Sequence, residues 1–144
     1  MIITEYNKFS ERKVVSFDFD GVLHISTHPG TLDPIELFDY WEWEPNKPLH
    51  KILRREHKSG HKIIIVTART DFKGWMSKSL WSFVEKFHLP VDDIIFTDLL
   101  PKKPILLNKK VIRHYDDKFD MIYELEGTGI EFVYVYKDKI KVIR

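Results

Sequence analysis

The sequence predicts one α/β domain built on a mainly parallel sheet with helices on both faces. Apolar, β-branched runs alternate along the chain with segments whose apolar residues recur at helical spacing. Such alternation is typical of βαβ units, and continuous apolar strands suit a parallel sheet that is covered on both sides. The 144 residues can form one domain with a substantial core. We therefore expect a single doubly wound domain over residues 1–144.

Four apolar runs are expected to be the parallel strands, and each runs into polar residues. They cover 14–17, 62–66, 93–97 and 111–115. Helical spacing predicts helices over 48–58, 72–87 and 118–126. The tail predicts a strand over 130–136, a tight turn at 137–139 and another strand over 140–143. Ligands of such sheets bind at the carboxyl ends of the strands, so polar residues there are candidate site residues.

The composition excludes several classes of protein and of site. Without cysteine, the chain has no disulfide, no thiolate nucleophile and no cysteine-ligated zinc. Neither GxGxxG nor a P-loop pattern occurs, which argues against dinucleotide-binding and P-loop functions. A net charge of +1 gives no general attraction to nucleic acid or membranes. Because no apolar run is long enough to span a membrane and the start does not resemble a signal peptide, we expect a cytoplasmic protein.

Two carboxylates, Asp18 and Asp20, follow the first predicted strand and precede Gly21. At this spacing they lie close together, and glycine lets the backbone bend sharply toward a ligand. One carboxylate can attack phosphorus as a nucleophile, while the other can pass a proton to the leaving oxygen. The alternative is an acidic surface turn, which the buried strand before the pair disfavours.

Asp116 and Asp117 follow the fourth predicted strand and add to this acidic edge. Carboxylates gathered at one place repel each other unless a hard cation joins them, and oxygen ligands favour Mg²⁺. We therefore expect a Mg²⁺ site that draws on Asp18, Asp20, Asp116 and Asp117. A helix cap near Lys118 is the alternative for the second pair, and both functions are compatible because one aspartate can cap while the other binds metal.

Thr67 ends the second predicted strand and is followed by Ala68 and Arg69. A hydroxyl and backbone N–H groups there can hold a phosphoryl oxygen, and a guanidinium can bind phosphate through two hydrogen bonds. A cation near the transferred group is expected from Lys102 or Lys103, which precede the fourth strand. The alternative for Thr67 is a threonine that merely finishes a strand.

Two further groups of residues have less specific interpretations. The seven histidines show no zinc-binding helix pattern, but His24 and His28 lie near the expected site and are candidates for substrate contact. A basic cluster either binds phosphates or is a solvated surface, and it comprises Lys102, Lys103, Lys109, Lys110 and Arg113.

Together these residues resemble the four motifs of the haloacid dehalogenase (HAD) superfamily. Residues 14–23 are similar to its first motif, Thr67 to the second, Lys102 or Lys103 to the third, and Asp116–Asp117 to the fourth. The resemblance covers residues 14–120 and implies a Rossmann-like HAD domain. The third and fourth motifs leave alternatives open: spacing favours Lys102 whereas Pro104 favours Lys103, and Asp116 stands where many members have glycine.

The resemblance also implies roles for individual residues. Asp18 would be the nucleophile and a metal ligand, while Asp20 would be the general acid/base and bind metal through its backbone carbonyl. Thr67 and the lysine would bind phosphate, and Asp117 would bind Mg²⁺ directly or through water. The implied activity is that of a phosphatase that forms an aspartyl-phosphate.

A narrower resemblance is to the HAD domains of RNA-repair proteins and polynucleotide kinase-phosphatases. It rests on residues 23–31 and on Thr67-Ala68-Arg69. Residues 22–47 leave room for a flap or short lid, with Trp41 and Trp43 in it, but not for a large cap. An open site suits a nucleotide or a polynucleotide 3′-phosphate end. The alternatives are a small-metabolite phosphatase and a catalytically idle HAD-like binding protein, and the sequence points to no protein partner.

Overall fold

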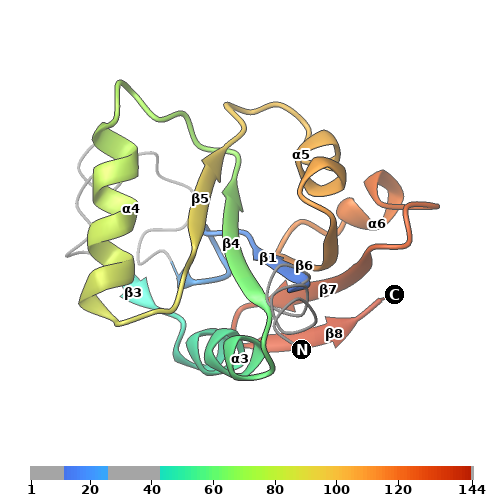
Figure 1. The fold of residues 1–144 in the computed structure, drawn as a ribbon, viewed down its shortest axis with the longest axis horizontal. Coiled ribbons are helices and arrows are strands. Elements are labelled where there is room, and N and C mark those ends of the chain that lie inside the picture. The colour runs from blue at the N-terminus through green and yellow to red at the C-terminus, as the bar shows by residue number, and fades with distance from the viewer. Residues whose placement is uncertain (1–11, 26–42, 144) are drawn as a thin grey trace, which may run out of the picture.

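The computed structural model describes residues 12–25 and 43–143, and in this part of the chain a six-stranded sheet forms the centre of the molecule (Figure 1). Its strands are β1 (Val14–Phe17), β4 (Lys62–Thr67), β5 (Asp93–Phe96), β6 (Val111–Asp116), β7 (Glu131–Tyr136) and β8 (Lys139–Val142). Two short strands, β2 (His24–Ile25) and β3 (Glu44–Pro45), form a separate antiparallel pair. The described helices are α3 (Lys47–Lys58), α4 (Trp75–Lys86), α5 (Lys103–Asn108) and α6 (Met121–Glu124).

The strand order confirms the predicted doubly wound α/β fold. Neighbouring strands run β5-β4-β1-β6-β7-β8, and all pairs are parallel except the hairpin of β7 and β8. From β1 the chain builds outward through β4 and β5, then returns to the other side of β1 to form β6 and β7. The topological switch point therefore lies beside β1, where ligands of such sheets bind.

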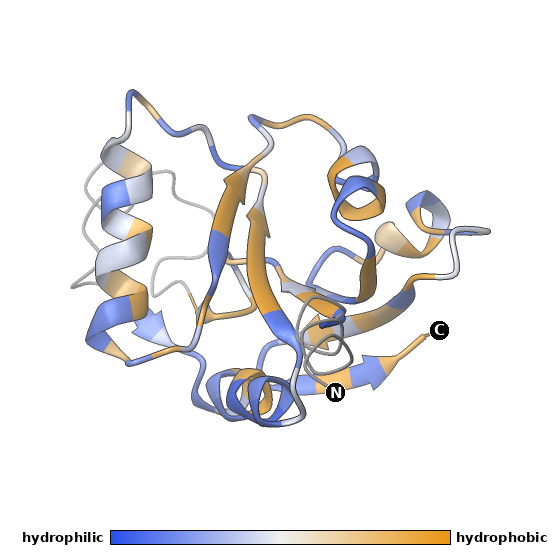
Figure 2. Cartoon of the chain, in the orientation of Figure 1, coloured by the Kyte–Doolittle hydropathy of each residue, from blue (hydrophilic) through white to orange (hydrophobic). Residues whose placement is uncertain are grey.

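Helices cover both faces of the sheet, as predicted. On β4, Ile63 and Ile65 belong to one buried cluster, whereas Ile64 and Val66 belong to another. The first cluster includes side chains of α3 and α4, and the second includes side chains of α5 and α6. Figure 2 shows why both are needed: the central strands are apolar along most of their length.

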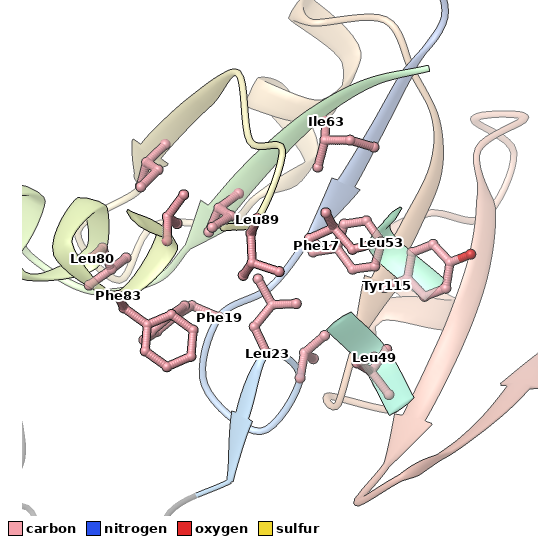
Figure 3. Packing of buried hydrophobic residues seen from close by; sticks show 14 of the residues in the cluster. Phe17, Phe19, Leu23, Leu49, Leu53, Ile63, Leu80, Phe83, Leu89 and Tyr115 are labelled. Carbon is pink, nitrogen blue, oxygen red and sulfur yellow. The ribbon is translucent and has the colours of Figure 1, made fainter. Parts of the chain in front are cut away.

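The larger core is rich in aromatic rings near the end of β1. Phe17 stacks on Tyr115 of β6, with ring centroids 4.3 Å apart, and Phe19 meets Phe83 of α4 edge to face at 5.1 Å (Figure 3). All of these rings are buried. Because the residues that flank Asp18 are locked in the core on both sides, the start of the loop after β1 is held in place.

The helix boundaries differ from the predicted ones for local reasons. Phe72, Lys73 and Gly74 all have positive φ, so α4 begins only at Trp75. The six-residue α5 was not predicted, because so short an element shows little periodicity. Helix α6 is shorter than predicted and covers four residues. Within the described residues, no helix is long and apolar enough to cross a membrane.

Candidate active site

The carboxyl ends of β1, β4 and β6 bring predicted site residues from three parts of the chain together. Phe17 is in register with Ile65 on β4 and with Tyr115 on β6, so Asp18, Thr67 and Asp116 all lie at this edge of the sheet. The backbone N–H of Asp18 donates to the carbonyl oxygen of Tyr115 at 2.8 Å. The first residue after β1 is therefore still held against β6.

Lys102 places a buried ammonium group between two of these carboxylates. Its Nζ lies 2.9 Å from Oδ1 of Asp18 and 2.8 Å from Oδ2 of Asp116. Only 7% of the residue is exposed. Burial lowers the pKa of Lys102, but the two carboxylates outweigh it and raise the pKa above the ordinary value. Lys103, the alternative, is the first residue of α5 and is exposed. The structure therefore brings Lys102, and not Lys103, into contact with the acidic residues.

Asp116 is held by a buried chain of hydrogen bonds that the sequence did not reveal. His114 Nε2 lies 2.8 Å from Oδ2 of Asp116, and Nδ1 of the same ring lies 2.7 Å from Oγ of Ser16. Because the carboxylate can only accept, Nε2 carries the proton. Burial opposes ionisation of Asp116, but the hydrogen bond from His114 and the charge of Lys102 hold its pKa well below the usual value. Oδ1 accepts the N–H of Lys118 at 3.0 Å.

Asp117 turns its carboxylate toward the loop that carries Asp18. A Cβ atom on Gly21 would lie 2.1 Å from Oδ2 of Asp117, and Gly21 has φ +74°. Only glycine fits this close approach without strain. Asp117 is an exposed residue, but partial desolvation of its carboxyl group and the charge of Asp116 raise its pKa to about 6.

Asp18, Asp116 and Asp117 form the acidic cluster of the site. One oxygen atom from each lies within 4.8 Å of one from each of the others. Burial, followed by the charge of Asp116, raises the pKa of Asp18 well above its usual value, and Lys102 opposes this only in part. The cluster therefore carries more negative charge than its own ammonium group balances, and its oxygen-only donors suit a hard divalent cation.

The side chain of Asp20 contacts residues outside the acidic cluster. Its two oxygens receive Nε of Arg69 at 2.7 Å and Nη2 of Arg69 at 2.5 Å, and Oδ1 also lies 2.7 Å from Nε2 of His24. Burial would raise the pKa of Asp20, but the hydrogen bonds from Arg69 and His24 hold it well below the usual value. Arg69 thus forms a bidentate ion pair with Asp20, and its predicted contact with phosphate stays a prediction.

The loop after β4 is tied to the loop after β5. Thr67 is buried at the end of β4, and its Oγ1 accepts the N–H of Arg69 at 3.2 Å. The carbonyl oxygen of Ala68 accepts the N–H of Leu99 at 2.8 Å. Asp98 and Leu99 both have positive φ, and 83% of Leu99 is exposed. The candidates for phosphate binding thus lie beside an exposed apolar rim, which consists of Leu99 and Leu100.

The sequence placed two tryptophans and two histidines near the site, and the structure describes one of each. Trp43, which the sequence placed in the flap, is buried against Phe19 and presents no exposed ring to a substrate, while Trp41 and His28 lie outside the described residues. His24 is buried and faces Asp20 rather than solvent.

The five basic residues do not form one surface. These residues are Lys102 in the site, Lys103 exposed at the start of α5, Lys109 and Lys110 just before β6, and Arg113, which pairs with Glu56 at 2.7 Å. The two lysines before β6 are therefore at the far end of the strand from Asp116.

His114 is the residue of the site that sequence reasoning missed. It lies within a predicted strand, and a lone histidine in a strand is ordinarily a core or surface residue. Its opposite neighbour Ser16 in the adjacent strand was the available signal, but strand register was needed to pair the two.

Solved structures share this fold. A chain of the Pnkp1/Rnl/Hen1 RNA repair complex superposes with a TM-score of 0.71 at 20% identity, covering 90% of this chain and 44% of that one. Another structure of the Pnkp1/Rnl/Hen1 complex gives the same TM-score at 22% identity and 47% coverage of that chain. The present chain thus spans about half the length of these neighbours.

A second kind of neighbour has a name that states its activity. D,D-heptose 1,7-bisphosphate phosphatase from B. bronchiseptica, complexed with magnesium and phosphate, superposes with a TM-score of 0.59 at 14% identity over 83% of this chain and 78% of that one. These likenesses support the resemblance to HAD phosphatases at the level of the fold. No protein-family model matches the sequence, and no curated protein matches it.

Proposed function

We propose that this chain is a Mg²⁺-dependent phosphomonoesterase in which Asp18 is the nucleophile. The observation that carries the proposal is the convergence of three carboxylates and the buried ammonium of Lys102 at the switch point of the sheet. An ordinary structural cluster would balance its charges, whereas this one retains two acidic groups with raised pKa values. Unbalanced charge at a place where ligands bind indicates a functional site rather than a cluster kept for stability.

The residues present fit a magnesium ion. All donors are carboxylate oxygens, and Asp117 has its oxygen seated over Gly21, where no other residue would leave room. Both oxygens of Asp116 already have protein partners, so we favour Asp117 together with Asp18 as direct ligands and Asp116 as the partner of Lys102. A carbonyl contact from Asp20 remains a prediction. Bound Mg²⁺ would neutralise negative charge on the phosphoryl oxygens and on Asp18.

The reaction would proceed in two steps on this chain's own side chains. In the first, Asp18 attacks phosphorus, the bond to the leaving oxygen breaks, and Asp20 supplies a proton to that oxygen. In the second, Asp20 takes a proton from water as the water attacks phosphorus, which releases phosphate and restores Asp18. Asp20 is held ionised by Arg69 and His24, the state that the second step requires, and it must take up a proton before the first. Lys102 and Thr67 would hold phosphoryl oxygens.

The favoured substrate is a nucleotide or a polynucleotide 3′-phosphate end. Two considerations support this choice: the fold is similar to a chain of an RNA repair complex, and exposed apolar side chains at Leu99 and Leu100 lie close in sequence to Lys102. A base beside the reacting phosphate could contact these side chains. A small-metabolite phosphatase is the second candidate, supported by the similarity to a heptose bisphosphate phosphatase. We further propose that residues 1–144 act as one domain, in the cytoplasm, and that 22–47 is a flap whose two described ends are held to the domain by the pairing of β2 with β3.

A phosphate-release assay tests the proposal. The panel should contain a 3′-phosphorylated oligonucleotide, its 5′-phosphorylated counterpart, the matching 3′-mononucleotide and sugar phosphates, each with Mg²⁺ or with EDTA. Asp18→Asn should abolish release without changing the melting temperature by more than a few degrees, because an amide cannot attack phosphorus. Asp98→Asn, at an exposed residue of the neighbouring loop, is the matched control and should keep activity. Release that persists in EDTA, or in the Asp18→Asn protein, contradicts the mechanism. A catalytically idle protein would release nothing from any member of the panel.

A further inference from the structure

His24 lies four residues after Asp20, at the start of β2, and the turn between the two residues fixes its backbone. The backbone N–H of Gly21 donates to the carbonyl oxygen of His24 at 3.0 Å, and the N–H of His24 donates to the carbonyl of Phe19 at 3.4 Å. Only 3% of His24 is exposed. The imidazole is thus part of the same rigid turn that carries Asp20.

Aromatic rings hold the imidazole in one orientation. Trp43 stacks on it with ring centroids 5.5 Å apart and an interplanar angle of 23°, and the Phe19 ring lies 4.8 Å away. Nδ1 is buried with no hydrogen-bond partner, whereas Nε2 lies 2.7 Å from Oδ1 of Asp20. A residue retained only for packing would leave no buried nitrogen unsatisfied, since phenylalanine would fill the space without that cost. The reason for a polar ring at this position is therefore its one polar contact, the hydrogen bond from Nε2 to Asp20.

Arg69 holds the same carboxylate from a second direction. Its guanidinium bonds both oxygens of Asp20 and lies over the Trp43 ring, 4.9 Å from the centroid. Trp43 therefore supports both His24 and Arg69. With donors from two different parts of the chain, the carboxylate of Asp20 is fixed in position and in rotation, while 45% of its side chain remains exposed to solvent.

We infer that His24 is a positioning residue that holds Asp20 for proton transfer to the leaving group. The inference rests on the proposed function and adds a residue whose burial rules out contact with substrate. If Arg69 alone held Asp20, the bidentate pair would keep the carboxylate aligned with the guanidinium, but the two groups could shift together with the long Arg69 side chain. Proton transfer depends strongly on such geometry, whereas binding of the phosphoryl group does not.

The consequence is a specific dependence on the leaving group. An alkyl phosphate expels a strongly basic oxygen that needs the proton from Asp20, whereas 2,4-dinitrophenyl phosphate expels a weakly basic one that does not. The quantity kcat/KM includes the step in which the leaving group departs. His24→Phe keeps an aromatic ring between Trp43 and Phe19 but removes the N–H donor. It should lower kcat/KM about tenfold for the best alkyl substrate and less than about twofold for the dinitrophenyl ester.

His50→Phe is the matched control. His50 is equally buried, at 3% exposure, and packs against Phe83, but its Nε2 donates to the carbonyl of Leu23 rather than to Asp20. This variant should change kcat/KM for both substrates by the same factor. His24→Gln, which restores an N–H donor at a similar reach, should recover part of the alkyl activity and also serves if His24→Phe does not fold.

The outcomes separate the two hypotheses. A selective loss on the alkyl substrate with recovery in His24→Gln supports the inference. An equal loss on both substrates, or faster alkyl hydrolysis in His24→Phe, overturns it while the phosphatase proposal stands. No release by the wild-type protein from any phosphomonoester defeats the proposed function itself, and the inference with it.

Discussion

Replacement of Lys102 by methionine should destabilise the metal-free protein more than any other single change at the site. Methionine has a similar length but no charge, so it removes the ammonium that lies 2.8 Å from Asp116 and 2.9 Å from Asp18. Both carboxylates are more than nine-tenths buried. Breaking a buried ion pair by removing one partner typically costs about 3–5 kcal/mol. For a domain of this size each kcal/mol corresponds to about 3 °C, so the melting temperature in EDTA should fall by about 10 °C.

Melting curves of the two adjacent lysine variants, with and without Mg²⁺, measure this effect. Lys103→Met is the matched control because Lys103 is exposed, and it should melt within about 2 °C of the wild type. Mg²⁺ should stabilise Lys102→Met more than the wild type, since a divalent cation can replace part of the missing charge; at a concentration 100 times Kd, binding adds about 2.7 kcal/mol. If Lys102→Met melts no lower in EDTA than Lys103→Met does, the buried ammonium does not hold these carboxylates together.

Three further changes test other parts of the structure. Gly21→Ala should weaken Mg²⁺ affinity at least tenfold by isothermal titration, because the new Cβ would overlap Asp117 and the positive φ adds strain; unchanged affinity would remove Asp117 from the metal site. Burial lowers the pKa of His50 to about 4, so the unfolded chain binds a proton there between about pH 6.5 and 4 while the folded chain does not. The contribution of His50 to the unfolding free energy should thus fall by up to about 3 kcal/mol across that window, so the wild type should lose more stability there than His50→Phe; parallel pH curves would contradict this. Leu100→Ser should raise KM for a 3′-phosphorylated oligonucleotide several-fold and leave KM for a sugar phosphate unchanged, whereas Leu107→Ser, on the exposed side of α5, should change neither; equal KM values in Leu100→Ser and wild type would remove the rim from substrate binding.

The fold could be predicted from the sequence because its signals are local and strong. The run at 63–66 is apolar at four successive positions, as expected of a strand buried on both faces, and β4 does bury alternate residues in opposite clusters. The alternation of strands and helices then allows few topologies. Helix ends were less predictable, since two successive non-glycine residues with positive φ, Phe72 and Lys73, have no reliable signature in the sequence.

The site was predictable in its location and much less so in its contacts. Strand ends converge whatever the side chains are, so Asp18, Thr67 and Asp116 could be brought to one edge of the sheet by topology alone. The choice between Lys102 and Lys103 could not be made in this way. The choice depends on where α5 begins, because Lys102 precedes the helix and Lys103 is its first residue. The turn of a few residues between β5 and α5 sets that start. The pairing of Ser16 with His114 likewise needed the register of β1 and β6.

The distribution of charge among the acidic residues follows from these unpredicted contacts. Asp116 is balanced by Lys102 and by a proton donor on His114, and Asp20 by Arg69 and His24, so both have lowered pKa values. Asp18 must share Lys102 with Asp116, and its pKa is raised, as is that of Asp117. Four carboxylates that look equivalent in the sequence thus divide into two that the protein itself neutralises and two that it does not. The negative charge that the protein leaves unbalanced is therefore concentrated on Asp18 and Asp117, which have carboxylate oxygens within 4.8 Å of each other, and this is the pair that we propose as direct ligands of Mg²⁺.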